Sequence, residues 1–498
     1  MKRFLLVIVA LLVANALSHA AVKPNSLFTD GAVLQHGIPV NVWGTANDGE
    51  KITVTFAGQK VSTVANGGQW KVTLKPLKVC AEPRTLTITG ENTVEVKNIL
   101  VGEVWVCSGQ SNMQWTLSQS AEAGAAVPSA NDALLRLFYV PRITADTPQA
   151  DVRTNWSACT PQTVPGFSAV AYFFGRDLRK ALNVPVGLIH TSWGGTPAES
   201  WTAKEALEAN PALKQLITDW DKKIAAYDPA KAAERNKAAA ARHKEAVAKA
   251  KAAGKPAPRA PRAESDPAKD AHRPTVLYNA MIAPLLPYGI KGAIWYQGES
   301  NSGRAKEYQT LFPAMIKCWR DNWREGEFPF FFVQIAPHNN MVPEIREAQF
   351  FTWQKTPNTG MAVITDYGNA SDIHPKQKEP VGARLALVAR AVAYSEKIEY
   401  SGPTYKSVKF DGNKATLTFS HVGGGLVAKD GALKGFTIAG ADKKFVAATA
   451  EINGDTIIVN SAEVAAPVAV RYGWANVPDV NLYNKAGLPA TPFRTDPE

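Results

Sequence analysis

Five continuous apolar runs alternate with helix-like stretches through the middle of this chain, and no other feature constrains its fold as strongly. The runs cover residues 99–107, 186–191, 290–296, 328–335 and 361–365. A strand with one wet face alternates apolar and polar residues, whereas a strand covered on both faces is apolar throughout. The pattern therefore predicts an α/β domain with a parallel sheet between helices, closed by an amphipathic helix over residues 380–393.

The segments on either side of this domain have a different character. Short alternating runs such as residues 51–56 and 414–419 are separated by Gly, Asn and Asp turns, which is typical of antiparallel sheets. A chain of 498 residues is also too long for one core. We expect an N-terminal β-sandwich-like module over residues 21–97, the α/β domain over 98–395, and a C-terminal β module over 396–498.

The first twenty residues have the pattern of an export signal. Lys2 and Arg3 precede an apolar run over residues 4–16, and the small residues Ser18 and Ala20 follow it. The run is shorter than the roughly 20 residues that a membrane span needs. We therefore expect residues 1–20 to be a signal peptide, the protein to be periplasmic or extracellular, and the mature chain to have no membrane span.

The net charge of +11 is concentrated in one segment. Residues 222–262 hold twelve Lys and Arg against three Asp and Glu, so they account for nine of the eleven excess charges. The segment is Ala- and Lys-rich without interleaved aromatic residues, which predicts a solvated helix followed by a Pro-rich linker. We expect a basic insertion over residues 204–273 and no nucleic-acid partner; weak attraction to anionic glycans or envelope surfaces is the alternative.

The four cysteines indicate neither a metal site nor a disulfide framework. They are scattered without a C-x-x-C pair, which leaves free thiols or an unassigned disulfide open: Cys80, Cys107, Cys159 and Cys318. No cofactor and no metal are expected.

Ser111 follows the first apolar run, in the turn Gly109-Gln-Ser-Asn-Met113. A hydroxyl at the carboxyl end of a strand and the start of a helix lies near free N–H groups, which stabilise a developing oxyanion. The flanking residues differ from the G-x-S-x-G elbow. Ser111 is a candidate nucleophile, and a nucleophilic serine needs a base and further oxyanion donors.

Two later strand ends offer such donors. Gly194 and Gly195 follow the second run, and glycine lets a backbone N–H approach a ligand closely. Gln297 and Asn301 follow the third run and carry side-chain amides, while Glu299 between them is suited to fixing the loop. Each turn alone is an ordinary loop feature, so the argument depends on their shared position.

His374 is the candidate base. Among eight histidines, it alone sits in a polar loop between a late strand and the last helix. Asp372 is placed to orient its ring, and Asp366 is a second candidate. Because ligands bind at the carboxyl ends of strands in open α/β sheets, the serine, glycine, amide and histidine segments are predicted to converge.

These segments resemble the sialate O-acetylesterase family of the SGNH (GDSL-like) hydrolases, in its exported bacterial form. The matching motifs are Gly-Gln-Ser-Asn-Met at 109–113, Trp-Gly-Gly-Thr-Pro-Ala-Glu-Ser-Trp at 193–201, Trp-Tyr-Gln-Gly-Glu-Ser-Asn at 295–301 and Asp-Ile-His-Pro at 372–375. The ending over 471–494 is also similar. The resemblance covers nearly the whole mature chain, and the basic insertion is its least familiar part.

The resemblance implies a flavodoxin-like three-layer α/β/α catalytic domain. It implies that Ser111 is the nucleophile and His374 the base, with an oxyanion hole made by the Ser111 N–H, a glycine of the 194–195 pair and the Gln297 loop. One position departs from the pattern. SGNH enzymes usually have Asp three residues before the histidine, where this chain has Ser371. Asp372, Asp366 or a backbone carbonyl therefore remains open as the group behind His374.

The expected activity is that of a metal-independent serine esterase removing acetyl groups from sugar hydroxyls, with 9-O-acetylated sialic acid as the leading substrate. Plant polysaccharide such as xylan or pectin is the alternative, and a catalytically inactive carbohydrate-binding protein is the alternative of another class. The sequence does not fix the oligomeric state.

The expected substrate contacts are Gln110, Trp193 and Glu299, with Arg346 as a candidate cation for a sialic acid carboxylate. A tryptophan-rich rim for sugar stacking is weighed against burial: Trp115, Trp193, Trp201 and Trp295.

Overall fold

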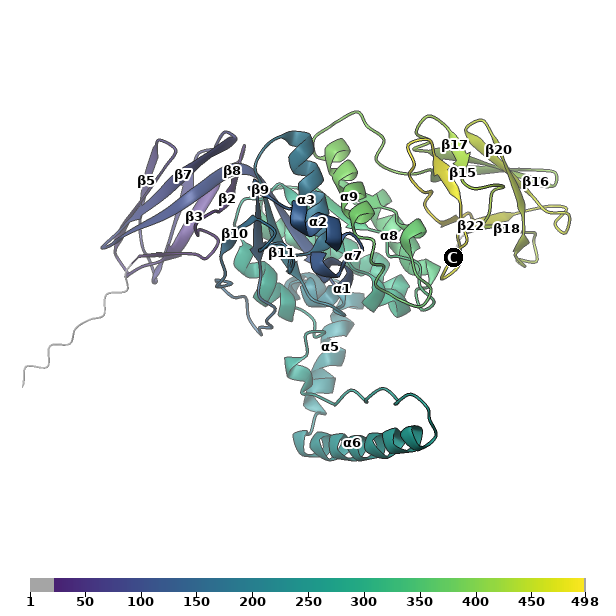
Figure 1. Cartoon of the computed structure of the whole chain (residues 1–498), viewed down its shortest axis with the longest axis horizontal. Helices are drawn as coiled ribbons and strands as arrows, with labels where there is room; N and C mark the ends of the chain where they lie inside the picture. Colours follow the sequence, from purple (N-terminus) through teal and green to yellow (C-terminus); the bar gives the residue numbers. More distant parts are fainter. Residues whose placement is uncertain (1–21, 497–498) are drawn as a thin grey trace, which may run out of the picture.

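The computed structural model describes residues 22–496, so the signal peptide expected over residues 1–20 lies outside the described residues. Figure 1 shows antiparallel β structure at one end, a mixed α/β body in the middle and a second group of antiparallel strands at the other end. This arrangement confirms the predicted α/β class with flanking β modules. Within the described residues, no helix is long and apolar enough to cross a membrane.

The central sheet has the strand order β10-β9-β11-β8-β12-β13-β14. All its neighbouring strands are parallel except β10, which runs antiparallel to β9 at one edge. The strands are β8 (Thr93–Gly109), β9 (Asp132–Tyr139), β10 (Trp156–Cys159), β11 (Val186–Ser192), β12 (Gly292–Tyr296), β13 (Phe330–Val333) and β14 (Thr359–Ala362). The five predicted runs correspond to β8, β11, β12, β13 and β14; β9 and β10, which carry more polar residues, are additions.

Helices cover both faces of this sheet, which explains why its strands are apolar throughout. Neighbouring residues of β8 enter different cores: Val106 packs in one, and Trp105 and Cys107 pack in the other. The helices are α3 (Ala169–Leu182) and α9 (Glu379–Val392) on the Trp105 face, and α7 (Ala305–Trp323) and α8 (Pro343–Lys355) on the Val106 face. The sheet is thus the middle of three layers.

The N-terminal β structure is joined to the central sheet by a shared strand. β8 pairs with β7 (Cys80–Thr89) and β2 (Val33–Gln35) in its first half and with β11 and β12 in its second half. The expected boundary at residues 97–98 therefore falls inside one strand. The remaining strands are β1 (Lys23–Pro24), β3 (Val40–Thr45), β4 (Lys51–Phe56), β5 (Gln59–Val64) and β6 (Gln69–Leu74).

The C-terminal strands enclose a separate small core that includes Leu417, Ile438, Tyr472 and Phe493. Its first sheet is β15 (Thr404–Asp411), β16 (Lys414–Ser420), β21 (Thr456–Asn460) and β20 (Thr449–Asn453). Its second sheet is β19 (Val446–Ala447), β18 (Phe436–Ala439), β22 (Ala469–Tyr472) and β24 (Phe493–Arg494). A short pair, β17 (Leu426–Ala428) and β23 (Leu482–Asn484), completes this part.

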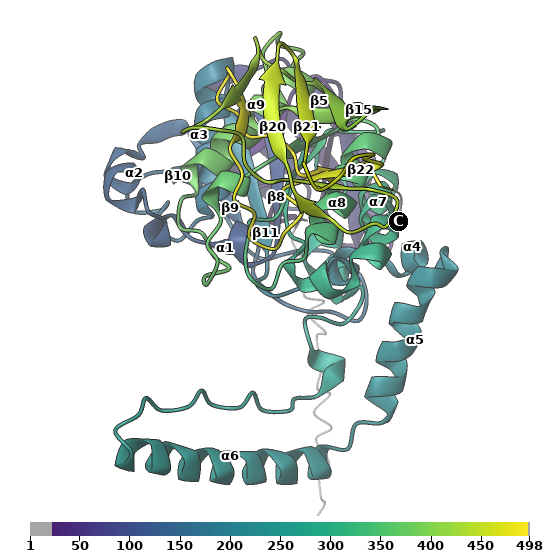
Figure 2. The same ribbon diagram turned by 90° about the vertical axis from the view of Figure 1, so that its right-hand side faces the viewer.

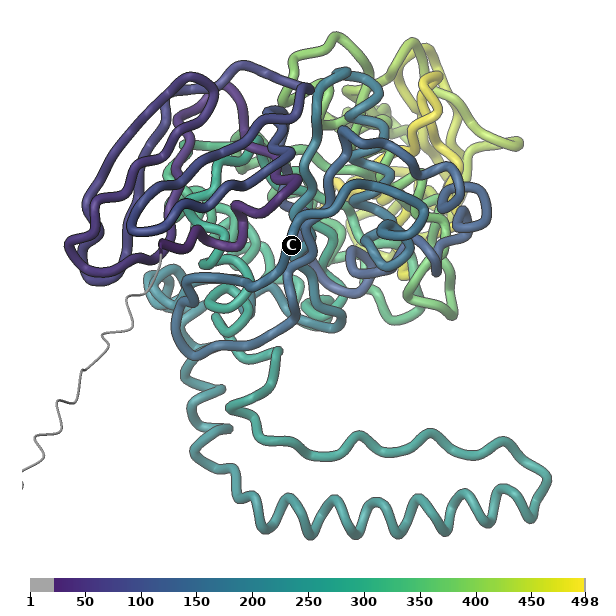
Figure 3. Tube along the Cα trace, turned by 60° about the vertical axis from the view of Figure 1, so that its left-hand side comes forward, coloured from purple at the N-terminus to yellow at the C-terminus, as the bar shows by residue number. Residues whose placement is uncertain are grey.

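The basic segment forms a helical arm. It comprises α4 (Lys204–Glu208), α5 (Pro211–Ala225) and α6 (Pro229–Ala252), and Figure 2 shows α5 and α6 extending away from the body. Ala232 is the one buried residue of α6, and the other residues of this helix are exposed or partly exposed. Figure 3 shows the chain returning beside α6 towards the body, where a short turn, Pro267–Lys269, docks. All four cysteines of the chain are free thiols.

Candidate active site

Ser111 begins α1 (Ser111–Gln114) directly after β8. The turn depends on Gly109, whose φ of +141° is unfavourable for other residues and whose added Cβ would lie 2.2 Å from the Tyr296 carbonyl oxygen. The Gln110 N–H donates to the same carbonyl at 3.0 Å. The nucleophile turn is therefore held against the end of β12.

His374 reaches Ser111 from the loop between β14 and α9. Its Nε2 lies 2.8 Å from the Ser111 Oγ, and its ring stacks on Trp115 with centroids 5.2 Å apart. Burial and the nearby Lys378 ammonium lower the pKa of His374. A neutral imidazole within hydrogen-bond distance of a serine hydroxyl is suited to accept its proton.

The two candidate acids behind His374 are placed differently. The Asp372 carboxylate lies 3.7 Å from Nδ1 of His374, and it accepts the backbone N–H of the same residue at 2.9 Å. Asp366 forms a two-pronged ion pair with Arg384, with both distances 2.7 Å. The expectation that Asp366 orients the His374 ring is therefore corrected, because its carboxylate is bound to Arg384 rather than to the imidazole.

Backbone N–H groups converge on the serine. The Ser111 N–H has no acceptor anywhere in residues 22–496. The Gly194 N–H donates to Gln114 Oε1 at 2.6 Å, and Gly194 packs so closely that an added Cβ would lie 3.2 Å from Cβ of Ser111. These two N–H groups thus lie beside the hydroxyl. In this structure, the Gly194 N–H is hydrogen-bonded to the Gln114 side-chain oxygen.

Gln297 and Asn301 are not placed to complete an oxyanion hole. The Gln297 amide donates to Asn301 at 2.6 Å and to the Thr196 carbonyl at 3.3 Å, and it accepts from Tyr308 at 2.9 Å. The Asn301 amide donates to Glu199 at 3.0 Å. Both side chains are fully buried, so their donors are already used inside the protein and the expectation is corrected.

A buried polar network that the motifs did not reveal lies beneath the reacting pair. The Asn112 amide donates to Glu299 at 2.7 Å and to the Ile373 carbonyl at 3.1 Å, and it accepts from the Lys378 ammonium at 2.6 Å. Burial lowers the pKa of Lys378 to about 7 and raises the pKa of Glu299. Asn112 thereby ties the nucleophile turn to the loop that carries His374. The sequence offered no signal for Lys378, because it stands in the polar run Lys376-Gln-Lys-Glu379.

Several expected substrate contacts are buried instead. Gln110 is buried and accepts the Ser300 N–H at 3.2 Å, and the Glu299 carboxylate is held by Asn112. Arg346 is 1% exposed and donates to the carbonyls of Ala475 and Asn476, so it is corrected as a candidate cation for a substrate. Trp201 and Trp295 lie in the core rather than on a rim.

Trp193 lies beside a shallow cavity that adjoins the serine. The cavity has a volume of about 400 Å³ and is bounded by the glycine pair at 194–195 and by the returning end of the arm, including Arg262, Lys269 and His272. Nδ1 of His272 lies 2.6 Å from Asp270, and its Nε2 would lie 3.7 Å from a Cβ added at Gly195. The sequence offered no periodic or motif signal for this contact, because the arm returns from far along the chain.

The fold, with a serine and a neutral histidine meeting at the carboxyl edge of a parallel sheet, is that of an α/β hydrolytic enzyme. No group of His, Cys, Asp and Glu suited to hold a metal occurs in the described part of the chain. Residues 268–389 match the family described as carbohydrate esterase, sialic acid-specific acetylesterase.

The comparisons with individual proteins extend this match over almost the whole chain. Sialate O-acetylesterase of Rattus norvegicus is 33% identical over 91% of this chain and 90% of its own length. The Homo sapiens protein of that name is 31% identical over 91% and 88%. The crystal structure of a carbohydrate acetylesterase from Xanthomonas citri is 39% identical, with a TM-score of 0.82, covering 96% of this chain and all of that one.

The chain belongs to the sialate O-acetylesterase family. It is a carboxylic ester hydrolase, and its reaction is the hydrolysis of O-acetyl esters on sugars.

Proposed function

We propose that this protein is an exported serine esterase that removes acetyl groups from the hydroxyls of sialic acids, with Ser111 as nucleophile and His374 as general base. The observation that carries the catalytic assignment is the 2.8 Å contact between Ser111 Oγ and His374 Nε2. The substrate assignment is supported by the names of the relatives and by the charge of the cavity beside the serine.

In this mechanism, Ser111 Oγ attacks the acetyl carbonyl carbon while His374 Nε2 takes the hydroxyl proton. The carbonyl oxygen becomes an oxyanion beside the N–H of Ser111 and that of Gly194, which becomes free when the Gln114 amide moves aside. Collapse breaks the ester C–O bond, and His374 returns its proton to the departing sugar oxygen. Water, deprotonated by His374, then hydrolyses the acetyl-enzyme and regenerates Ser111.

The catalytic assignment predicts the effect of removing either residue. His374→Ala is expected to lower kcat on an aryl acetate by about 10²–10⁴-fold, because general base catalysis typically contributes that much. Ser111→Ala is expected to abolish both turnover and labelling by an aryl organophosphonate. Ser118→Ala, at an exposed serine nearby, is the matched control. Near wild-type hydrolysis by either site variant contradicts the assignment.

The cavity beside the serine supports an acidic sugar. Arg262 and Lys269 line it and have no acidic partner within the described chain, and the one acid among the lining residues, Asp270, is paired with His272 at 2.6 Å. Their positive charge suits the carboxylate of a sialic acid whose acetyl group is at Ser111, a role that the buried Arg346 does not fill. The contribution of such exposed charges is modest, of order 1 kcal/mol in total.

Steady-state kinetics on matched substrates tests this specificity. The measurement compares kcat/KM for 9-O-acetyl-N-acetylneuraminic acid and for its carboxamide. The double variant Arg262→Gln/Lys269→Gln is expected to lose about fivefold on the acid and nothing on the carboxamide. Lys244→Gln/Lys249→Gln, on the exposed face of α6, makes the same change in charge as a control. Faster acetate release from acetylated xylan than from the sialic acid contradicts the sialate assignment.

Export is supported by the leader-like residues at the start of the chain. Expression in a Gram-negative host, followed by N-terminal sequencing of the periplasmic fraction, is expected to give a chain beginning at Ala21. Recovery in the cytoplasm with Met1 retained contradicts export without affecting the catalytic assignment.

A further inference from the structure

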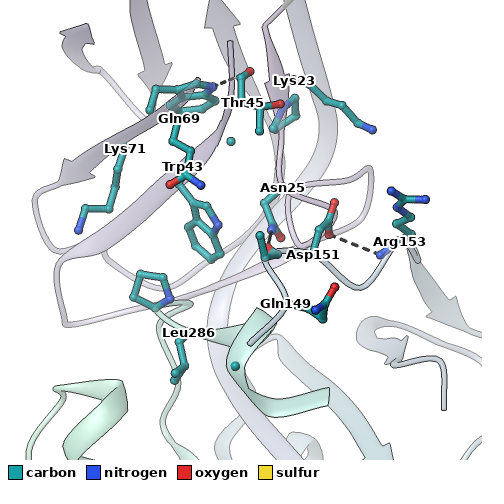
Figure 4. A pocket seen from close by; sticks show the side chains of 16 residues that line it. Lys23, Asn25, Trp43, Thr45, Gln69, Lys71, Gln149, Asp151, Arg153 and Leu286 are labelled. Carbon is teal, nitrogen blue, oxygen red and sulfur yellow. Dashed lines mark hydrogen bonds between the residues drawn. The ribbon is translucent and has the colours of Figure 1, made fainter. Parts of the chain in front are cut away.

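A second pocket lies between the N-terminal β structure and the central domain. Its volume is about 620 Å³, within the range of small-ligand sites. Figure 4 shows side chains from β1, β3 and β6 on one side and the segments 149–153 and 283–287 on the other. Leu286 and Pro287 precede β12, whereas the Ser111 site adjoins the opposite, carboxyl end of that strand. The two sites share no lining residue.

The centre of this pocket presents an aromatic ring next to an uncommitted amide. Trp43 is half-buried, and its ring is held edge-on by Phe28 with centroids 4.9 Å apart. Figure 4 shows that ring in the middle of the pocket, close to Gln69 and Asn25. The Gln69 side chain has no hydrogen bond within residues 22–496, whereas the Asn25 amide donates to the Ala150 carbonyl at 2.9 Å. An apolar face beside a free amide suits the C–H face and hydroxyls of a sugar.

The rim of the pocket is positively charged. Lys23, Lys71 and Arg153 line it; the Arg153 backbone N–H donates to Asp151 at 3.4 Å, but none of the three side-chain charges has an acidic partner in the described chain. Asp151 is the one acid among the lining residues, and its carboxylate is held by the hydroxyl of Ser26 at 3.0 Å and by the Val152 N–H at 2.8 Å. The unpaired charge therefore favours a ligand that carries a carboxylate.

We propose that this pocket is a non-catalytic binding site for an acidic sugar unit of a glycan, with its ring on Trp43, its hydroxyls on Gln69 and its carboxylate among Lys23, Lys71 and Arg153. A second site on the same chain raises the effective concentration of a glycan near Ser111 without taking part in the reaction. This proposal goes beyond the esterase activity and does not depend on which acetylated sugar is hydrolysed.

Calorimetric titration of the full-length Ser111→Ala protein tests the proposal, with sialyllactose and trigalacturonic acid as acidic probes and lactose as the neutral one. At least one acidic probe is expected to bind tenfold or more tightly than lactose. The double variant Gln69→Ala/Lys71→Gln is expected to weaken that binding at least fivefold, while Lys60→Gln, at an exposed lysine of the same β module, leaves it unchanged.

The same variants separate this site from the ester site. With Ser111 restored, Gln69→Ala/Lys71→Gln is expected to keep the wild-type kcat/KM on an aryl acetate, so loss of binding is not loss of fold. Trp43→Phe, which keeps an aromatic ring against Phe28, is expected to reduce binding less than Trp43→Ala. No binding of either acidic probe, equal binding of lactose, or an equal loss in Lys60→Gln overturns the proposal. An unchanged Kd in Gln69→Ala/Lys71→Gln also overturns it.

Discussion

At the scale of single residues, the candidate site depends on groups that hold the reacting pair as much as on the pair itself. Trp115 stacks on the His374 ring, and Asn112 connects the nucleophile turn to the histidine loop through the Ile373 carbonyl. Lys378 is buried against Asn112 and contributes positive charge close to the imidazole. Burial and the Lys378 ammonium, a group outside the reacting pair, therefore lower the pKa of His374.

The pH profile tests this arrangement. His374 acts as a base only when neutral, and its lowered pKa places the acidic limb of kcat/KM below the ordinary histidine value of 6.5. Lys378→Met removes a positive charge that disfavours protonation of the imidazole, so the pKa of His374 rises. The acidic limb is expected to move to higher pH, measured with an aryl acetate. Lys376→Met, at the exposed lysine two residues earlier, is the control; a limb that moves equally in both variants contradicts the assigned role of Lys378.

The two aspartates near His374 are expected to differ in what their loss affects. Asp372→Asn lowers kcat by about fivefold or less, because its carboxylate is half-exposed and 3.7 Å from the ring. Asp366→Asn leaves the chemistry intact but costs about 2 kcal/mol of unfolding free energy, because it weakens the bonds to Arg384. Kinetics and urea denaturation measure the two effects. A loss of several orders of magnitude in kcat for Asp366→Asn, with unchanged stability, reverses the assignment.

At the scale of secondary-structure elements, strand ends determine where the site forms. β8, β11 and β12 are in register, with Gly109 opposite both Ser192 and Tyr296, so their following loops meet. β8 also extends into the N-terminal sheet, which anchors the nucleophile turn in two sheets at once. The close approach of β8 and β12 leaves no room for a side chain at Gly109.

Gly109→Ala is accordingly expected to destabilise the fold and reduce activity. Its Cβ would lie 2.2 Å from the Tyr296 carbonyl oxygen, and the backbone strain adds of order 1–3 kcal/mol. Gly124→Ala, in α2 (Ala123–Ser129), meets nothing within 4 Å and is expected to be neutral or stabilising. Thermal unfolding and aryl acetate kinetics compare the two variants. Wild-type stability and activity in Gly109→Ala contradict the requirement for a glycine there.

At the scale of the whole molecule, buried polar contacts join the C-terminal β structure to the central domain. Arg346 of α8 donates to the carbonyls of Ala475 and Asn476, and Arg494 of β24 forms a two-pronged ion pair with Glu347, with distances of 2.7 and 2.8 Å. Neither contact includes Ser111 or His374. They fix how the parts sit together rather than the chemistry.

Breaking that ion pair is expected to loosen the C-terminal part and to spare catalysis. Glu347→Gln replaces the buried carboxylate by a neutral amide and so weakens the two-pronged contact with Arg494, which is expected to cost about 2 kcal/mol of unfolding free energy. Chemical denaturation reports the loss, and limited proteolysis is expected to cut first in the linker over residues 395–403. The kcat on an aryl acetate is expected to stay within about twofold of wild type, because the ion pair does not include a residue of the active site. Glu463→Gln, exposed in the same β module, is the control; equal sensitivity of both variants contradicts a joining role.

Much of the fold followed from local pattern, and part of the site did too. Strand periodicity and the turn residues after each run predicted the parallel sheet, its flanking β modules and the meeting of Ser111 with His374 at one edge. The partners of the polar side chains did not follow, because a hydrogen bond such as that between Gln297 and Asn301 depends on packing across distant segments. Asn112 and Lys378 were missed for the same reason, since neither belongs to a periodic pattern.

By itself, the sequence determined the class of fold, the family and the segments that form the site, because local periodicity and short motifs are written along the chain. Only the tertiary structure decided which groups are free to act. It committed Asp366 to Arg384, buried Arg346 against the C-terminal part and used the amides of Gln297 and Asn301 internally. It also brought the end of the arm beside Gly195. Burial and long-range pairing are properties of the packed chain, and they settle the chemistry of a polar residue that its neighbours in sequence leave open.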